Sequence, residues 1–583
     1  MNYDKFPLIP ISNRDEDCCE GWQAVCSRLK QALDGISGNR KVLVVECYPG
    51  VHLEELREAL VADLQPTLLI DARTALLPER TIRERAERLL GDHQVFGYMS
   101  DWHVWNFFDP DRFEAIQAEI DAVESGRVIV WGTGAALLAG DRDLLVYADM
   151  ARWEIQQRMR REEVSNLGVE NRDAPFALQY KQAYFIDWRA CDLLKRELMD
   201  EWDYVLDTNL PGQPKLVSGE LVRSGLRRVA KRPFRVVPFF DPGPWGGQWM
   251  KEVCDLDRSA VNYAWCFDCV PEENSLLLGV GASVVEIPSI NLVFYQPDEL
   301  LGKDVRERFG EEFPIRFDFL DTMGGGNLSL QVHPLREYAR EHFGIEYTQD
   351  ESYYMLDVAE GAFVYLGLRE DVDPDQMMAE LEAARAGGAP FDADKHVQKW
   401  PVKKHDHVLI PAGTVHCSGK DSMVLEISAT PYIFTFKLWD WGRLGLDGKP
   451  RPISLDHGRE NICWDRKAAW VQRELLDRVE PVASGDGWRE ERTGLHELEF
   501  IETRRHWFTK PVLHDTQGAV NVLNLVQGHE ALVESPTGAF APFVVHYAET
   551  FIVPAAVGPY TIRPHGTSAG SECATLKAWV RPS

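Results

Sequence analysis

The sequence predicts a multidomain protein in which an N-terminal α/β region is followed by two mainly β regions with helical insertions. Three observations predict this fold class. The chain has 583 residues, 45% of them hydrophobic, which is enough for more than one core. Short apolar runs alternate with charged amphipathic stretches as far as about residue 235. Beyond that point, β-type runs separated by Gly and Pro predominate.

The first predicted domain, residues 1–235, alternates strands with helices. The apolar runs "KVLVVE", "PTLLIDA" and "RVIVWG" have the length and composition of buried strands. The stretches "LEELREALVADL", "PERTIRERAERLL" and "RFEAIQAEIDAV" lie between them and have helical character. Strands joined by helical connections of this length imply a parallel sheet with crossover helices.

One loop of this domain stands where an α/β protein would bind phosphate. In "KVLVVECYPGVHLEEL", a strand and a tight turn lead directly into a helix. A working phosphate loop needs several glycines and a Lys-Ser/Thr pair, but here Gly50 is followed by Val51 and His52. The sequence therefore predicts a P-loop-kinase-like, nucleoside-kinase-like fold with a degenerate Walker motif. Nucleotide or anion binding by another route, and a purely structural or oligomerisation role, both stay open.

The second and third predicted domains, residues 236–490 and 491–583, are mainly β. The second opens with "RVVPFFDPGPWGGQWMKE" and includes helical insertions such as "DPDQMMAELEAARAG". The third contains "HELEFIETRRHWF" and "AVNVLNLVQGHEALVES". Short β-type runs with frequent turn residues predict antiparallel sandwiches or barrels.

Composition and charge exclude several classes of partner. A formal net charge of −29 argues against nucleic acid and anionic membranes, which repel an acidic surface. We expect a cytoplasmic protein, because the chain has neither a secretory signal nor an apolar run of about 18 residues. The 11 cysteines are expected to be free or buried thiols. The oligomeric state is left open.

A metal-binding constellation is predicted in the second domain. Gln331 and His333 stand two residues apart in a strand, so their side chains share one face. In "HVLIPAGTVH", a strand and a Gly-containing turn lead to His416, which we expect to enter a barrel interior from the opposite strand. Glu351 adds a carboxylate. Two imidazoles, a carboxylate and an amide oxygen suit Zn²⁺ or another divalent first-row metal, and leave room for substrate.

At these residues the chain resembles the class I mannose-6-phosphate isomerases of the cupin superfamily. "PWGGQWMKE", "FPIRFDFLDTMGGGNLSLQVHP", "KWPVKKHDHVLIPAGTVHCSG", "VLEISA" and "KLWDWGRLGLDGKPRPISL" follow in the family's order. "VNVLNLVQGHEALVES" resembles the family's second cupin, without a metal motif. The resemblance covers about residues 236–583, whereas 1–235 lie outside the usual family architecture.

The resemblance implies a double cupin built of two jelly-roll barrels. It also implies one Zn²⁺ per chain, with other divalent metals possible, held by Gln331, His333, Glu351 and His416. The implied reaction is the interconversion of mannose 6-phosphate and fructose 6-phosphate through an enediol, so that a small-molecule hexose phosphate is the expected partner.

Such an isomerisation needs a base, an electrophile for the oxyanion and a basic anchor for the phosphate. The resemblance assigns proton transfer to Glu426, and it assigns Arg443 and Lys449 to the vicinity of the substrate phosphate. Lys437 stands where the family usually has an arginine, and we expect it to be catalytic together with Glu426 and Arg443. Ser329 shares a strand face with Gln331, so that we expect it, like Lys449, to contact the substrate.

Three positions depart from the family pattern: Gln349 replaces a usual lysine, Lys437 a usual arginine, and Leu335 a usual aspartate. A lysine keeps the charge of an arginine but loses its two-pronged grip on an oxyanion. Three alternatives therefore stand beside the leading hypothesis. They are a non-catalytic sugar-phosphate sensor, an isomerase for a different hexose phosphate, and a bifunctional enzyme whose N-terminal domain phosphorylates the sugar.

Overall fold

The computed structural model describes residues 2–429, 432, 434–494 and 496–582. The chain is multidomain, with substantial β-sheets, and forms two compact units. The α/β unit comprises Leu8–Val229 and Ser275–Tyr295, and the β unit comprises Met1–Pro7, Ala230–Asn274 and Gln296–Ser583. Both predicted β domains thus fall in one unit, while a hairpin from the middle of the chain belongs to the α/β unit.

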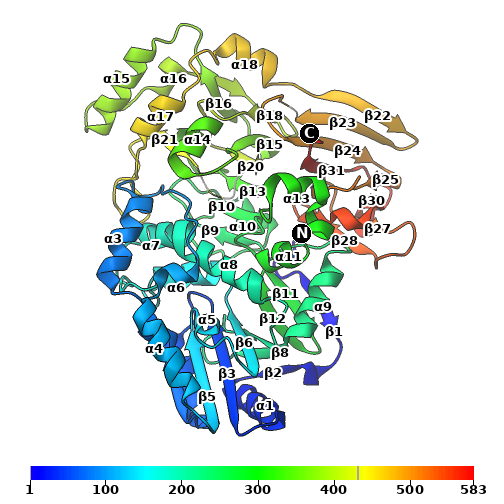
Figure 1. The fold of residues 1–583 in the computed structure, drawn as a ribbon. Coiled ribbons are helices and arrows are strands. Elements are labelled where there is room, and N and C mark those ends of the chain that lie inside the picture. The colour runs from blue at the N-terminus through cyan, green and yellow to red at the C-terminus, as the bar shows by residue number, and fades with distance from the viewer. Residues whose placement is uncertain (1, 430–431, 433, 495, 583) are drawn as a thin grey trace. The chain divides into compact units, whose positions relative to one another are not determined.

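A seven-stranded sheet organises the α/β unit (Figure 1). Its strand order is β2-β8-β7-β6-β3-β5-β4. Five neighbouring strands are parallel, as predicted: β3 (Arg40–Cys47), β4 (Leu68–Asp71), β5 (Gly126–Gly132), β6 (Leu144–Asp149) and β7 (Tyr204–Asp207). At one edge β8 (Lys215–Ser218) and β2 (Cys18–Glu20) pair antiparallel. A smaller sheet joins β1 (Leu8–Ser12), β11 (Ser275–Val280) and β12 (Ser283–Pro288).

The connections between the parallel strands are helical. In α2 (Leu53–Leu64), buried Leu56, Leu60 and Leu64 recur every four residues and form its apolar face. Asp109 caps α4 (Pro110–Asp121), because its carboxylate accepts from the first backbone N–H groups of the helix. The other helices are α1 (Trp22–Gly35), α3 (Glu79–Leu90), α5 (Ala135–Leu138), α6 (Arg152–Arg160), α7 (Phe176–Gln182), α8 (Trp188–Leu198), α9 (Gly219–Val229) and α11 (Ile290–Tyr295).

The β unit contains two pairs of antiparallel sheets, which confirms the predicted antiparallel character. In the first pair, one sheet has the order β18 (His407–Ile410), β15 (Asp350–Val358), β20 (Ser422–Ala429), β13 (Arg316–Asp321), β10 (Trp265–Cys269) and β9 (Phe239–Asp241). The other has the order β17 (Val397–Pro401), β16 (Phe363–Leu368), β19 (His416–Ser418), β14 (Leu330–Val332) and β21 (Phe436–Trp439).

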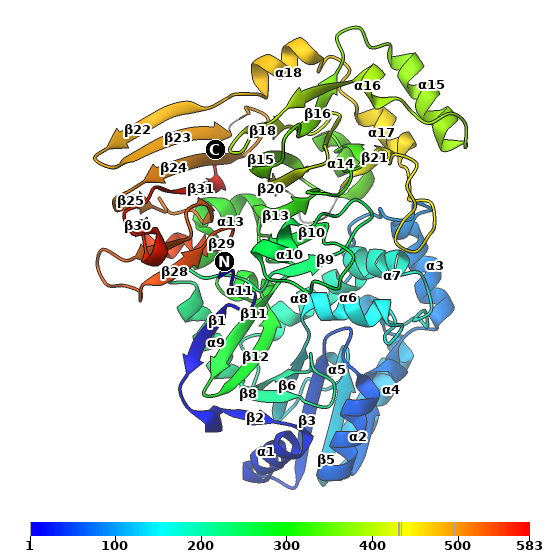
Figure 2. The same ribbon diagram turned by 180° about the vertical axis from the view of Figure 1, so that it is seen from behind.

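The second pair is formed by the C-terminal strands (Figure 2). One sheet has the order β22 (Glu480–Gly485), β23 (Trp488–Gly494), β24 (Ile501–Phe508), β31 (Cys573–Val580), β26 (Asn521–Gln527) and β29 (Thr550–Val553). The other has the order β25 (Val512–Asp515), β30 (Pro559–Pro564), β27 (Glu530–Glu534) and β28 (Phe543–His546). Buried apolar side chains of both sheets, including Phe508, Leu523, Val533 and Ile562, form one core cluster between them.

Helices of the β unit are insertions between strands, as predicted for the second domain. They are α10 (Trp249–Val253), α12 (Pro297–Leu301), α13 (Lys303–Phe309), α14 (Arg336–Phe343), α15 (Pro374–Arg385), α16 (Ala393–His396), α17 (Leu455–Asn461) and α18 (Ala468–Glu474).

A buried arginine ties distant segments of the β unit together. Arg235 Nη1 lies 2.9 Å from Glu549 Oε1, and Nη2 lies 3.3 Å from Asp268 Oδ1. The same guanidinium donates to the carbonyl oxygens of Asp4 at 2.7 Å and Thr550 at 3.1 Å. Because both carboxylates are also buried, this cation is their charge compensation.

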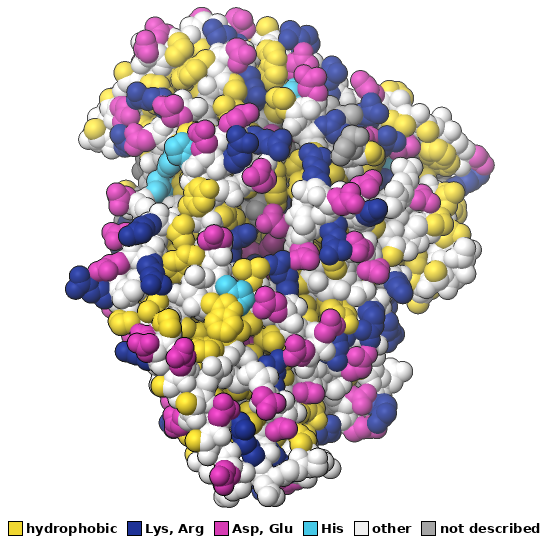
Figure 3. Space-filling view, in the orientation of Figure 1, with side chains coloured by type: hydrophobic (Ala, Val, Ile, Leu, Met, Phe, Trp, Pro, Cys, Tyr) yellow, Lys and Arg dark blue, Asp and Glu magenta, His cyan; other side chains and the backbone are white. Residues whose placement is uncertain are grey.

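The surface charge, the cysteines and the helix lengths can each be compared with the sequence. On the face seen in Figure 3, acidic and basic side chains are interspersed. All eleven cysteines are free thiols, as expected. Among the described residues, none of the helices combines the length and the apolar character needed to cross a membrane.

Candidate metal centre

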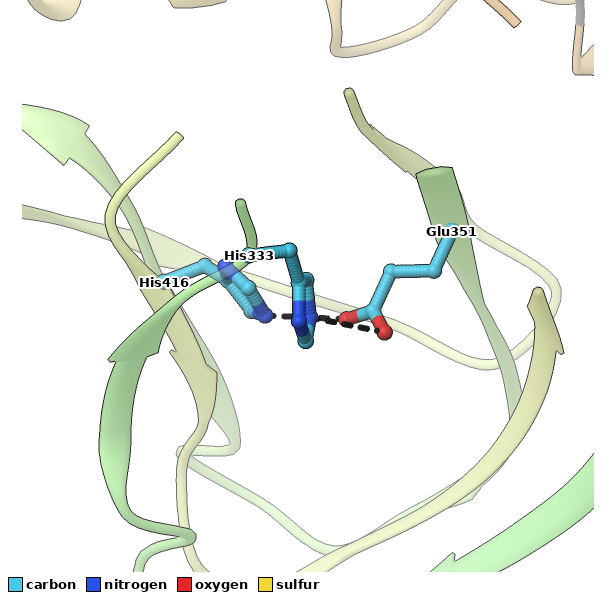
Figure 4. Close-up of side chains that lie close together, drawn as sticks. All are labelled: His333, Glu351 and His416. Carbon is cyan, nitrogen blue, oxygen red and sulfur yellow. Dashed lines mark ion pairs between the residues drawn. The ribbon is translucent and has the colours of Figure 1, made fainter. Parts of the chain in front are cut away.

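Three side chains of the first sheet pair converge in the interior of the β unit (Figure 4). His333 Nε2 lies 3.0 Å from Glu351 Oε2, and His416 Nε2 lies 2.9 Å from Glu351 Oε1. All three side chains are fully buried, and their candidate ligand atoms lie within 4.8 Å of one another. This is a compact set of two imidazoles and one carboxylate.

The second nitrogen of each imidazole is already bonded. His333 Nδ1 lies 2.8 Å from the carbonyl oxygen of Phe434, and His416 Nδ1 lies 2.8 Å from that of Thr414. A carbonyl oxygen only accepts, so each Nδ1 carries a proton and each ring turns its Nε2 toward the carboxylate. At this separation a proton or a metal cation must lie between each Nε2 and the carboxylate oxygen that it faces. In metal-ligating histidines the remote N–H commonly donates to a carbonyl in this way.

The electrostatics of the trio favour positive charge beside the Glu351 carboxylate. Burial opposes protonation of His333, but the Glu351 carboxylate outweighs it and raises the pKa of the imidazole. Burial alone would raise the pKa of Glu351, yet His333 and His416 hold it well below its usual range. Glu351 is therefore an anion that requires positive charge beside it.

Gln331 completes the predicted set from the neighbouring position. Its terminal amide lies 3.3 Å from His416 Nε2, and the two residues are directly paired between β14 and β19. The prediction that His416 comes from the strand opposite was wrong, because β19 is the hydrogen-bonded neighbour of β14. It is Glu351, on β15, that comes from the other sheet of the pair.

The turn before His416 is fixed by close packing. Gly413 has φ +88°, and a Cβ there would lie 2.6 Å from Cys463 Sγ and 2.8 Å from Leu335 Cδ2. Its N–H donates to the carbonyl oxygen of His333 at 3.0 Å. Arg466 Nη1 donates to three oxygens of the same turn at 2.6 to 2.8 Å. The turn therefore sets His416 directly against the strand of His333.

A cavity of about 200 Å³ adjoins the trio. Its wall combines aromatic rings, two carboxylates, three cations and polar groups, contributed by Trp245, Trp265, Phe267, Arg316, Asp318, Leu320, Leu328, Ser329, Gln331, Gln349, Glu426, Thr435, Lys437 and Arg451. Gln331 belongs both to this wall and to the predicted ligand set. The cavity is therefore placed to receive a small polar molecule beside the candidate metal.

Two carboxylates of the wall face one another across neighbouring strands. Glu426 on β20 is the direct partner of Asp318 on β13, and both are buried. Burial, reinforced by Asp318 and Glu351, raises the pKa of Glu426 well above its usual range. Burial also raises the pKa of Asp318 to about 7, although Arg316 opposes the shift. Carboxyl groups perturbed in this way can exchange protons near neutral pH.

Sequence reasoning missed Asp318, Arg316 and Arg451. Arg316 is 3% exposed, and its Nε and Nη2 have no hydrogen-bond partner among the described residues. In "RFDFL", Arg316 and Asp318 alternate with Phe in an otherwise apolar strand, which is the same signal that singled out Gln331 and His333. That alternation could have found this pair, whereas Arg451 lies in a loop without any such pattern.

Of the predicted substrate residues Ser329, Arg443 and Lys449, only Ser329 lines the cavity. Ser329 lines the cavity, where its hydroxyl donates to Asp440 at 3.0 Å and accepts from Arg451 at 3.2 Å. Arg443 pairs with Asp440 and donates to the carbonyl oxygen of Asn327 at 2.6 Å, but it is not part of the cavity wall. Lys449 is exposed and also lies outside the wall. Arg451, two residues after Lys449, lines the cavity wall instead.

The three positions that depart from the family pattern, Lys437, Gln349 and Leu335, have different surroundings. Lys437 lines the cavity, and burial lowers the pKa of its ammonium to about 7. Gln349 donates to Glu351 Oε2 at 3.0 Å and accepts from the backbone N–H of Phe434 at 3.0 Å, so it orients the carboxylate. Leu335 precedes α14 and packs near Gly413 rather than facing the cavity.

The phosphate-loop position of the α/β unit also borders a cavity, of about 690 Å³. It lies beyond the carboxyl ends of β3, β4 and β5, where α/β sheets commonly bind ligands. Five glutamates and three arginines line it, a balance that does not favour an anion. Buried Arg158 holds the loop by donating to the carbonyl oxygen of Gly50 at 2.7 Å. The kinase-like fold and nucleotide binding stay predictions.

Similar proteins fall into two groups. Residues 21–231 match a family described as a domain of unknown function, DUF8485. A mannose-6-phosphate isomerase of Streptococcus mutans is 28% identical over 250 residues, which is 41% of this chain and 72% of the relative. The mannose-6-phosphate isomerase ManA of Bacillus subtilis is 29% identical over 153 residues, 26% of this chain and 45% of that relative. A crystal structure of the mannose 6-phosphate isomerase from Bacillus subtilis matches 60% of this chain and 99% of its own, with 17% identity and a TM-score of 0.48.

Proposed function

We propose that this chain is a metal-dependent aldose–ketose isomerase that interconverts mannose 6-phosphate and fructose 6-phosphate through an enediol. The observation that carries the proposal is the convergence of His333, His416 and Glu351 beside a cavity that holds both carboxylates and cations. The sequence relatives support it, because their names describe mannose-6-phosphate isomerases. We further propose that both sheet pairs are cupin barrels and that the protein acts in the cytoplasm.

The residues present fit a divalent metal ion. His333 Nε2 and His416 Nε2 point at the Glu351 carboxylate at 3.0 and 2.9 Å, and the Gln331 amide lies beside them. His333, Glu351, His416 and Gln331 would hold the ion, as a nitrogen and oxygen donor set suited to Zn²⁺. When bound, it would supply an electrophile that stabilises negative charge on the sugar oxygens.

Glu426 is the group that we assign to proton transfer. Isomerisation removes a proton from one carbon of the sugar and returns it to the neighbouring carbon. Glu426 lines the cavity, and its burial favours the protonated form needed after the first transfer. Asp318 lies directly across from it and strengthens this preference through like-charge repulsion.

The phosphate is assigned to the cationic part of the wall. Arg316, Lys437 and Arg451 line the same small cavity, whereas Arg443 acts through Asp440. Arg451 Nη1 lies 2.7 Å from Asp440 Oδ2 and 3.2 Å from the Ser329 hydroxyl, so its head group is oriented before any ligand arrives. Preorganised cations of this kind bind a phosphate without a further ordering cost.

The test is turnover by the metal-loaded, full-length protein on a panel of hexose 6-phosphates, measured as formation of fructose 6-phosphate. Metal content is measured on the same samples. His416→Ala should lose both the metal and the activity. His407→Ala is the matched control, because His407 is a buried histidine of the same sheet pair that bonds Ser352 rather than Glu351.

Activity on mannose 6-phosphate that disappears in His416→Ala but survives in His407→Ala supports the proposal. One bound metal in the wild type without turnover on any hexose phosphate contradicts the isomerase and favours a sugar-phosphate sensor. Turnover only on another hexose phosphate contradicts the substrate alone.

A further inference from the structure

The second sheet pair has an interior that is apolar at one end and polar at the other. A cavity of about 320 Å³ occupies the polar end. Three strands each contribute one side chain to the apolar core and another to the cavity. These are Phe508 and His506 on β24, Val512 and His514 on β25, and Cys573 and Lys577 on β31. Residues two or four apart in a strand share a face, so these polar side chains stand where the strand pattern calls for apolar ones.

Two imidazoles in this cavity have ring nitrogens without partners. His514 is 3% exposed, and neither Nδ1 nor Nε2 has a hydrogen-bond partner among the described residues. His506 Nε2 lies 3.4 Å from Glu490 Oε1, which only accepts, so this nitrogen carries the proton and Nδ1 presents a lone pair. His506 Nδ1 likewise has no partner in the described chain. Burial lowers the pKa of both imidazoles, which are therefore neutral.

A lysine faces the same space. Lys577 is 8% exposed, and its Nζ lies 4.8 Å from the ring centroid of Trp579. In the parts of the chain that the structure describes, no hydrogen-bond acceptor contacts this ammonium. Burial lowers the pKa of Lys577 to about 8, so the group keeps its charge at neutral pH. Arg504, by contrast, is engaged by Glu490 at 2.9 Å and Glu502 at 2.7 Å.

Buried polar groups without partners are costly, and native proteins retain them where water, an ion or a ligand completes their bonding. The hydrogen-bond donors and acceptors on the cavity wall indicate which kind of ligand fits. A simple anion would accept from Lys577 but would meet the lone pair of His506 Nδ1 and the Asp515 carboxylate on the same wall. A divalent cation would use the lone pairs but would stand beside the ammonium. A hydroxyl group donates to the lone pair and accepts from the ammonium, and so satisfies both.

We propose that this cavity is a second ligand site, separate from the candidate metal centre, and that it binds a small neutral polyol of monosaccharide size through His506, His514 and Lys577. Its volume falls within the range of small-molecule sites, and the mouths of β-barrels are common places for them. The inference is independent of the isomerase proposal, because none of these residues lines the cavity beside His333.

The experiment is a saturation-transfer difference NMR titration of the full-length protein with D-glucitol. This probe has neither a carbonyl nor a phosphate, so it lacks the groups expected to engage the metal centre. We expect a saturable signal in the wild type and in His416→Ala. His514→Phe and Lys577→Met should each weaken binding at least tenfold. Matched controls outside the cavity are His565→Phe and Lys510→Met, which should bind as the wild type does.

Thermal melting of each variant shows whether it is folded, and either cavity variant alone can decide the test. The proposal is overturned if no saturable signal is found, which means that water fills the cavity, or if the folded cavity variants bind normally. It is also overturned if glucitol fails while inorganic phosphate binds in a Lys577-dependent way. A second Zn²⁺ equivalent that is lost in His514→Phe would make the cavity a metal site instead.

Discussion

Replacing Arg316 tests whether the cavity of the metal centre holds the substrate anion. The guanidinium is buried on the wall, and its Nε and Nη2 have no partner among the described residues. These two donors match the oxygens of a phosphate in a bidentate contact. Each hydrogen bond to a charged group contributes about 1.5 to 3 kcal/mol, so losing both removes about 3 kcal/mol or more. Arg316→Met should therefore raise KM by about 100-fold.

Arg316→Lys keeps the charge but loses the fork, so we expect a smaller rise in KM, of about tenfold. The assay is the initial rate of fructose 6-phosphate formation over a wide range of mannose 6-phosphate, with a melting curve of each variant to show that it is folded. A fall in kcat at unchanged KM would refute the reasoning. It would mean that Arg316 serves as the counter-ion of Asp318 and Glu426, which also lie within its electrostatic reach.

Three further predictions follow from the same unit. Glu426→Gln should lower kcat by about 10²-fold to 10⁴-fold with little change in KM, measured by steady-state kinetics. Because burial lowers the pKa of Lys437 to about 7, its ammonium loses its charge as the pH rises above that value. The value of kcat/KM should therefore fall about tenfold per pH unit above pH 7. Lys437→Arg should abolish this fall, because an arginine keeps its charge. Arg235→Met leaves two buried carboxylates uncompensated and should cost about 3 to 5 kcal/mol in urea unfolding, part of which Glu549→Gln should restore.

A different result would contradict each of these three predictions. An unchanged kcat in Glu426→Gln would assign proton transfer elsewhere, with Asp318 as the next candidate. An alkaline limb that persists in Lys437→Arg would belong to another group. If Glu549→Gln fails to improve the Arg235→Met protein, the cost comes from lost packing and not from stranded charge.

Local patterns in the sequence determined much of the architecture and of the metal centre. Strand and helix periodicity predicted the parallel sheet of the α/β unit and the antiparallel strands that follow, since both periods are set by backbone geometry. The two-residue spacing placed Gln331 and His333 on one face, and the turn around Gly413 indicated that His416 would join them. These are features that a few consecutive residues decide, so they can be inferred without knowing the partners.

Only the tertiary structure decided which strands face one another. It placed His416 on the neighbouring strand and Glu351 on the other sheet, brought Arg316 and Arg451 to the cavity, and left Lys449 outside it. It also gathered the imidazoles and the ammonium of the second cavity from three separate strands. Strand pairing joins segments far apart in the chain, and alternation within one strand tells which side chains share a face but not what that face meets. The chemistry of both cavities depends on those meetings.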